Sequence, residues 1–237
     1  MKIAIIGPGK MGTALGKYLN ITPSKNIESL ENVDIIFITT PDSEIYGVYK
    51  RIKNIKKDTI FIHMSGSLTS EIFENNIGFS VHPMAAVTKE TDLTNIMFTI
   101  EGNSLHIGKI KALFPNNIII KKEAKPLYHA AAVIASNFLV GIYNIAESLL
   151  KEAGIEDSTM LTGLVNATLH NIKTKGSIEA LTGPVERADT DTIKTHLNTI
   201  PEDFIEIYKT LSLHLIKIAK EKNQTKDYHQ LLRIFHE

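Results

Sequence analysis

Histidines at strand ends and on an apolar helix are the residues of this sequence best suited to acid–base chemistry. His63 and His82 each follow a short apolar run and precede turn residues. His129 lies in a long apolar stretch that also contains Ser136 and Asn137. Reduction of a carbonyl leaves an alkoxide that needs a proton, and imidazole titrates near neutral pH. We expect His129 to donate this proton, while Asn137 and Ser136 orient a substrate.

These polar residues also have structural interpretations, which the sequence leaves open. A strand-end histidine is commonly a packed residue, and polar groups on an apolar helix can satisfy neighbouring backbone. Two histidines, His63 and His82, at the ends of neighbouring strands favour a catalytic site. Imidazole also binds zinc, but no third ligand stands at a suitable spacing, so we expect no metal.

Arg187 is a candidate for binding a substrate carboxylate through a two-pronged pair. It follows the helix-breaking segment 181–184. It can equally form an ion pair with Glu186 or Asp189 inside the protein. Asp189 or Thr190 can in turn cap the helix that follows.

A phosphate-binding fingerprint follows the first strand. The pattern G-x-G-x-x-G is matched by Gly7, Pro8, Gly9, Lys10, Met11 and Gly12. Its place between a strand and a helix makes it specific for a dinucleotide. The first glycine permits a tight turn, the second lets the backbone approach a pyrophosphate, and the third lets the helix pack on the strand. A glycine turn without a cofactor is the weaker alternative.

The segment after this helix bears on the choice between NAD and NADP. NAD-specific folds place an acidic residue about 20 positions after the fingerprint, at the end of the second strand. Here residues 22–26 occupy that region, and Glu28 and Glu31 are the nearby acids. Ser24 and Lys25 can bind a 2′-phosphate, which favours NADP; the alternative is a solvated loop with an ordinary surface lysine.

Further strand ends supply residues expected to line the cofactor crevice, because ligands bind outside the carboxyl ends of parallel strands. Thr40 and Pro41 close one strand and Ser65 follows another. Asp42 is expected to cap the next helix, with Glu44 in the first turn.

The spacing of apolar residues predicts an α/β fold: an N-terminal Rossmann-type doubly wound parallel sheet with a C-terminal all-helical domain. The first domain covers residues 1–123 and the second 124–237. In the second, residues 127–153 form a helix that is apolar on most faces and is expected to be buried. The expected strands are 3–6, 34–39, 59–63, 79–82, 97–100 and 117–120; the expected helices are 10–19, 43–52, 127–153, 158–173, 177–182, 189–197, 201–222 and 227–236.

Composition narrows the function classes. Lys plus Arg and Asp plus Glu both number 26, so no net charge draws the chain to nucleic acid or an anionic membrane. There is no cysteine, which excludes disulfides and thiolate catalysis. The N-terminus lacks a signal-peptide pattern, and no apolar run approaches the length of a membrane span. We expect a cytoplasmic location and no nucleic-acid or membrane partner.

The motifs together resemble Rossmann-like proteins with a C-terminal domain of unknown function (DUF2520 type), within the 6-phosphogluconate dehydrogenase-like group. This resemblance implies NADP-linked oxidoreduction and a homodimer formed through the helical domain. The matching segments are GPGKMG at 7–12, TTPDSEI at 39–45, HMSGSLTS at 63–70, SVHPM at 80–84, IEGN at 100–103, YHAAAVIASN at 128–137 and ALTGPVERAD at 180–189.

Ketopantoate reductases of the wider group carry a helix with Lys-x3-Asn-x3-Asn, and His129, Val133 and Asn137 stand at the corresponding places. The acid has changed type and the middle amide is lost. The resemblance implies an NADPH-dependent reductase of a small 2-oxo acid, with 2-dehydropantoate as the first substrate to consider. Reduction of a cyclic imine, as in pyrroline-carboxylate reductases, and a non-catalytic NADP(H) sensor are the alternatives.

Overall fold

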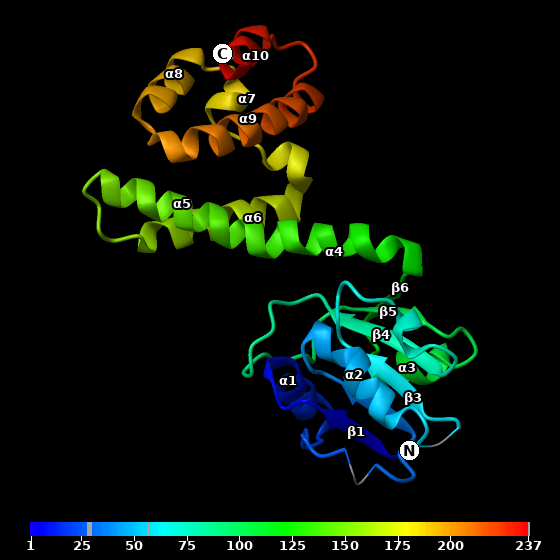
Figure 1. Ribbon diagram of the computed structural model, residues 1–237. Helices are drawn as coiled ribbons and strands as arrows, with labels where there is room; N and C mark the ends of the chain where they lie inside the picture. The colour runs from blue at the N-terminus through cyan, green and yellow to red at the C-terminus, as the bar shows by residue number, and fades with distance from the viewer. Residues whose placement is uncertain (28–29, 56, 237) are drawn as a thin grey trace. The chain divides into compact units, whose positions relative to one another are not determined.

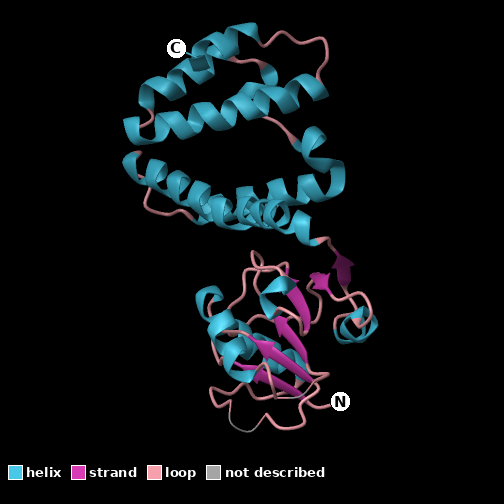
Figure 2. Cartoon of the chain, turned by 45° about the vertical axis from the view of Figure 1, so that its right-hand side comes forward, coloured by secondary structure: helices cyan, strands magenta, loops and turns pink. Residues whose placement is uncertain are grey.

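A computed structural model describes residues 1–27, 30–55 and 57–236. The chain forms two compact units, Met1–Phe138 and Leu139–Glu237. Figure 2 shows the strands gathered in the first unit and helices throughout the second. The boundary falls later than the expected 123/124, because the first turns of the long helix pack their polar side chains against the sheet of the first unit.

A six-stranded sheet forms the centre of the first unit (Figure 1), and continuous apolar runs explain its strands. Its order is β1-β2-β3-β4-β5-β6. Neighbours pair in parallel except β4 and β5, which are antiparallel. The expected doubly wound parallel sheet is therefore confirmed, with one antiparallel pair. The strands are β1 (Ile3–Ile6), β2 (Ile35–Ile38), β3 (Ile60–His63), β4 (Ile77–Pro83), β5 (Phe98–Gly102) and β6 (Asn117–Ile119).

Helices cover both faces of this sheet, as a doubly wound fold requires. One apolar core includes residues of α1 (Lys10–Leu19) and α3 (Ile107–Leu113), and the other includes residues of α2 (Asp42–Ile52). The sequence analysis missed α3, whose short apolar pattern lies between two strands. Two 3-10 turns, η1 (Ser70–Phe73) and η2 (Lys122–Ala124), complete the unit together with the start of the long helix.

The second strand of a standard Rossmann sheet is reduced here to one bridge. Ser24 pairs in parallel with Ile6 outside the named strands. Its backbone N–H donates to the oxygen of Ile5 at 2.9 Å, and its own oxygen accepts from Gly7 at 2.9 Å. The expectation that residues 22–26 occupy the second-strand region is therefore confirmed at Ser24. Glu28 lies outside the described residues.

The long apolar helix is continuous but changes its winding. It comprises α4 (Lys125–Val133), a π-helical turn η3 (Ile134–Phe138) and α5 (Leu139–Glu152). Together with η2 it is long and apolar enough, by length and composition, to cross a membrane, and its most apolar window is unburied. The expectations of a buried helix and of no run near membrane length were both wrong. Among the described residues, neither compact unit buries the apolar faces of this helix.

Helices build the second unit. A core of buried residues gathers Val185, Ile193, Ile216, Tyr228 and Leu231 with their neighbours. The helices after α5 are α6 (Thr159–Ala180, kinked at Gly176), α7 (Pro184–Arg187), α8 (Thr190–Thr199), α9 (Glu202–Lys222) and α10 (His229–His236).

Candidate functional site

The glycine loop between β1 and α1 has the geometry that the fingerprint predicts. Gly7 adopts φ +105°, a conformation that L side chains rarely adopt. A Cβ at Gly12 would lie 1.8 Å from the oxygen of Gly7, so only glycine lets α1 approach the strand. A Cβ at Gly9 would meet nothing within 4 Å, so the backbone there is open to a ligand. No acidic residue stands in the first turn of α1, which suits an anion.

The end of β2 lies against this loop. The Thr39 hydroxyl donates to the oxygens of Gly7 at 2.7 Å and Ile6 at 2.9 Å, which fixes the turn. Thr40 Oγ1 is buried without a hydrogen-bond partner among the described residues. Buried polar atoms normally have partners, so this hydroxyl fits a site whose ligand completes its bonding.

Ser24 and Lys25 follow the bridge beside β1, and both are exposed. Ser24 Oγ accepts a hydrogen bond from the backbone N–H of Asn26 at 2.9 Å, which shapes the turn. Ser24 therefore lies in the second-strand region, and Lys25 directly follows it.

Asp42 does not cap α2, in contrast to the expectation. Pro41 holds the cap position, and Asp42 and Glu44 both lie in the first turn. The Asp42 carboxylate instead accepts hydrogen bonds from Ser65 Oγ at 2.6 Å and Ser67 Oγ at 2.9 Å. A carboxylate and two hydroxyls thus connect the ends of β2 and β3.

His63 is fully buried, and both of its ring nitrogens have partners. Nδ1 accepts from the backbone N–H of Ser65 at 3.2 Å, so Nε2 carries the proton toward the oxygen of Thr69 at 3.1 Å. The ring also packs against Phe73. Of the two interpretations of His63, this geometry favours the structural one: the ring holds the loop after β3.

Lys125, which the sequence analysis missed, lies beneath this loop with its side chain fully buried. Its ammonium donates to the oxygen of Ser65 at 3.1 Å and to Ser80 Oγ at 2.7 Å. No carboxylate among the described residues forms an ion pair with it. Burial lowers the pKa of Lys125 to about 8, against the opposing charges of Glu101 and Asp42. A lysine four residues before His129 on one helix face was the available signal.

His82 and His129 meet in the structure, a point that the sequence left open. Their ring centroids lie 5.8 Å apart, nearly perpendicular. A Cβ at Gly66 would lie 2.4 Å from His129 Nδ1 and 3.0 Å from His82 Nε2, so a glycine lets both rings approach the loop. His129 Nδ1 is buried without a partner among the described residues. Tyr128, also missed, places its hydroxyl 2.7 Å from His82 Nδ1.

The imidazoles of His63 and His82 are kept neutral by their surroundings. Burial, with a smaller contribution from the Lys125 charge, lowers the pKa of each to about 4. His129 adds to the effect on His82. A site that holds neutral rings beside a buried cation suits proton transfer better than the binding of a second cation.

Ser136 and Asn137 lie in the π turn η3. Ser136 Oγ donates to the oxygen of Ala132 at 2.8 Å and to Asn137 Oδ1 at 3.0 Å. Asn137 is exposed. Residues spaced four apart in an α-helix shift gradually around the helix axis, because a turn contains only 3.6 residues. A π turn contains more residues per turn, so it brings the side chains of His129 and Asn137 closer to one face of the helix. Such turns occur frequently at functional sites.

Arg187 belongs to the second unit. Its guanidinium lies 3.6 Å from Asp189 Oδ2, the internal ion pair that the sequence left open. Asp189 also caps α8 by accepting from the N–H of Thr192 at 3.1 Å. The guanidinium remains largely exposed, so this pair leaves donors available to another carboxylate.

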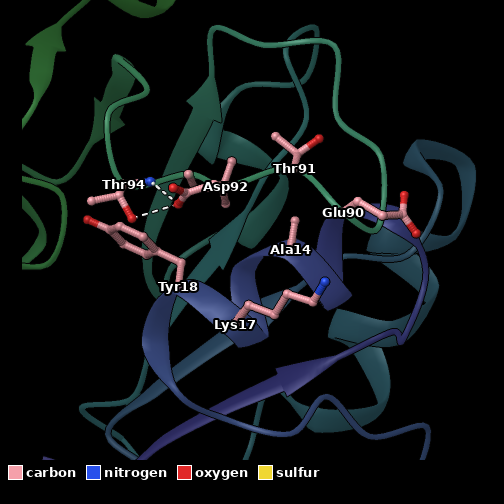
Figure 3. A pocket seen from close by; sticks show the side chains of 8 residues that line it. Ala14, Lys17, Tyr18, Glu90, Thr91, Asp92 and Thr94 are labelled. Atoms are coloured by element: carbon pink, nitrogen blue, oxygen red, sulfur yellow. Dashed lines mark hydrogen bonds between the residues drawn. The ribbon is translucent and has the colours of Figure 1, made fainter.

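A cavity of about 300 Å³ also lies in the first unit, beside the second half of α1 (Figure 3). Lys17, Tyr18, Glu90 and Asp92 line it, and Asp92 accepts from Thr94. None of the residues expected at the cofactor or catalytic site lines this cavity. The candidate site is therefore the carboxyl edge of β1–β4 with the start of α4, not this cavity.

Comparison with known proteins agrees with this fold. Residues 96–215 match the profile of a family described as "Domain of unknown function (DUF2520)". No curated protein matches the sequence.

Solved structures cover nearly the whole chain. Protein TM1727 from Thermotoga maritima is 24% identical, with a TM-score of 0.76 over 94% of this chain and 98% of that one. A putative NADP oxidoreductase, BF3122 from Bacteroides fragilis, is 20% identical, with a TM-score of 0.74 over 91% and 98%. The pyrroline carboxylate reductase of Plasmodium falciparum with NADP bound is 15% identical, with a TM-score of 0.62 over 94% and 96%. At these identities the likeness shows the Rossmann-type fold.

The close packing at the glycine loop predicts unequal effects of two alanines. Gly12→Ala forces a Cβ into the oxygen of Gly7, and we expect a loss of about 1–3 kcal/mol in the free energy of unfolding. Gly9→Ala, the matched control, meets open space and should unfold like the wild type. Urea denaturation at one pH measures both, and equal stabilities would contradict the packing.

The lowered pKa values of His63 and His82 predict acid sensitivity. An unfolded histidine titrates near 6.5, so between pH 6.5 and about 4 the unfolded state binds more protons. Stability is therefore full above pH 6.5 and falls as the pH drops through that window, by at most about 1.4 kcal/mol per pH unit for each ring. Urea denaturation across pH 4–8 measures the slope, and His82→Gln should reduce it. A flat profile would show that the rings titrate normally.

Proposed function

Because the chain belongs to the DUF2520 family, which its matched residues establish, we propose that it is an NADPH-dependent reductase of a small carbonyl compound. One observation carries the proposal. The open glycine loop and the paired His82 and His129 belong to the same compact unit, at the carboxyl edge of its parallel strands. Ligands of open α/β sheets bind at this edge.

The residues of the first unit fit a dinucleotide. The backbone of residues 7–12 would hold the pyrophosphate, and Thr40 and Pro41 would lie beside the nucleotide, where Thr40 Oγ1 lacks a partner among the described residues. Ser24 and Lys25 would bind a 2′-phosphate, which favours NADP over NAD. Ser65, held by Asp42, would complete the crevice. The cofactor, when bound, supplies a hydride.

The polar residues of the long helix would then serve the substrate. His129 turns Nδ1 inward, which leaves Nε2 as the nitrogen that can give a proton to the substrate oxygen. Ser136 and Asn137, already bonded to each other, would orient the substrate. Arg187 would hold a carboxylate with the donors that Asp189 leaves free.

A small 2-oxo acid has a ketone oxygen that a proton donor can serve and a carboxylate that a guanidinium can bind. We propose 2-dehydropantoate, reduced to pantoate, as the first candidate, which would make the protein a ketopantoate reductase of pantothenate biosynthesis. A cyclic imine is the second candidate, because pyrroline carboxylate reductase of Plasmodium falciparum shares the fold. Imine reduction depends less on a strong proton donor. A sensor that binds NADP(H) without turnover is the non-enzymatic alternative.

The exposed apolar faces of the long helix and α6 support a homodimer. Ile134, Phe138, Val140, Met160 and Leu164 are all more than half exposed in the single chain. Soluble monomers rarely expose apolar surface on this scale, and a second copy is the partner always present. Burial against a second copy would also explain why a helix that is apolar enough for a membrane carries the polar residues of the site. We propose a cytoplasmic dimer that binds neither membrane nor nucleic acid.

The enzymatic proposal predicts saturable oxidation of NADPH, followed at 340 nm, with 2-dehydropantoate and the purified full chain. Other 2-oxo acids and cyclic imines are screened in parallel, each with NADH as the alternative donor. We expect His129→Asn to lower kcat by about 10²-fold or more while cofactor affinity is retained, because a general acid is lost.

The controls separate the alternatives. Gly9→Ala, which should fold normally, should lose NADPH binding, and Lys25→Ala should narrow the difference between NADPH and NADH. NADPH binding without turnover of any candidate would contradict the reductase and leave the sensor. Turnover of a cyclic imine that His129→Asn leaves intact would select the second candidate.

The dimer proposal predicts that the chain sediments as two copies at micromolar concentration. Leu164→Glu, at an exposed position of α6, should shift it toward monomer because a charge would be buried. Leu105→Glu, at an even more exposed leucine of the first unit, is the matched control and should remain dimeric. A monomeric wild type in analytical ultracentrifugation would refute the proposal.

A further inference from the structure

Tyr128 stands behind the histidine pair and has no part in the chemistry described so far. We propose that Tyr128 and His82 form a proton relay that resupplies His129 from solvent. This inference rests on the proposed reductase function and deepens it, because it names the residues through which protons reach the reacting group.

The geometry places the three side chains in a row. The Tyr128 hydroxyl lies 2.7 Å from His82 Nδ1. His82 Nε2 and His129 Nδ1 both lie within 3.0 Å of the point where a Gly66 Cβ would stand. The two nitrogens therefore face one small space above Gly66, which a ring rotation or one water molecule can bridge.

The outer end of the row reaches the surface. Tyr128 is half-buried, and its hydroxyl also lies 2.8 Å from the sulfur of Met84, an exposed residue. A thioether is a weak acceptor, so it holds the hydroxyl proton loosely. Rotation about the Tyr128 C–O bond turns that proton from Met84 to His82. The Tyr128 hydroxyl thus has two partners, Met84 and His82, which packing of the ring alone would not require.

The transfer balances without a further reagent. His129 gives its Nε2 proton to the reduced substrate oxygen and receives one at Nδ1 from His82 Nε2. His82 receives one at Nδ1 from the Tyr128 hydroxyl, and the tyrosinate recovers a proton from water. One proton enters from solvent and one leaves on the product. No electrons move through the relay, and both rings end neutral in the opposite tautomer. A half-turn of each ring then returns its proton to the donating side before the next turnover.

The surroundings favour transfer over storage of the proton. The charged and titratable groups that act on His82 are Lys125 of α4, Asp42 of α2 and His129. Burial first, and then the charges of Lys125 and His129, lower the pKa of His82 to about 4, while Asp42 opposes them. A ring that resists a positive charge passes a proton on rather than holding it.

The first experiment compares Tyr128→Phe with Tyr46→Phe in the full chain. Both remove a hydroxyl from a ring, and the Tyr46 hydroxyl donates to Glu74 and contacts none of Met84, His82 and His129 among the described interactions. We expect Tyr128→Phe to lower kcat about tenfold, less than loss of the general acid itself, with unchanged KM and NADPH affinity. Added imidazole should restore the rate, and the solvent isotope effect on kcat should rise. Unchanged kcat with normal wild-type turnover would overturn the relay while the reductase stands.

The second experiment does not depend on turnover. Nitrogen-15 NMR of the histidine rings reports which nitrogen of His82 carries the proton. We expect Tyr128→Phe, and not Tyr46→Phe, to change the tautomer of His82 and to slow proton exchange at His129 Nδ1. If the wild type reduces no candidate substrate, the proposed function fails on that result alone. Identical His82 tautomers and exchange rates in both variants would then overturn the relay as well.

Discussion

The contact between the buried Lys125 ammonium and the ends of β3 and β4 fixes the rest of the candidate site. An ammonium without a paired carboxylate is costly to bury, and here it is stabilised by a backbone oxygen and a serine hydroxyl. This interaction holds the first turn of α4 against the sheet. It thereby places Tyr128 and His129, which follow on the same helix, beside His82. The Lys125 charge also adds to burial, the larger cause, in keeping the imidazoles of His63 and His82 neutral.

Much of the first unit was predictable because local patterns determine it. Short apolar runs, several of them continuous, indicated the six strands of the sheet, and the spacing of glycines indicated the loop between β1 and α1. The antiparallel pairing of β5 was not predictable, since strand direction depends on connections rather than composition. Lys125 and Asp42 were missed for a related reason. A lysine and an aspartate at helix starts look like surface residues until the partners Ser80 and Ser65, distant in sequence, are known.

The sequence pattern of the long helix correctly identified apolar faces but wrongly predicted that the same chain buries them. Its apolar faces indicated burial, yet within the chain they are exposed. Apolar periodicity reports that a surface avoids water, and it does not say whether the same chain supplies the cover. The pairing of His82 with His129, by contrast, is shown within one compact unit and needs nothing from the second.

The π turn at Ile134–Phe138 lies where the first compact unit ends and the second begins. A π turn is equivalent to one extra residue inserted in an α-helix. It lets α4 present Lys125 and His129 to the sheet while α5 follows a register of its own, so the two stretches can diverge in sequence without disturbing each other. Deleting a single residue there would rotate everything downstream by about 100° about the helix axis.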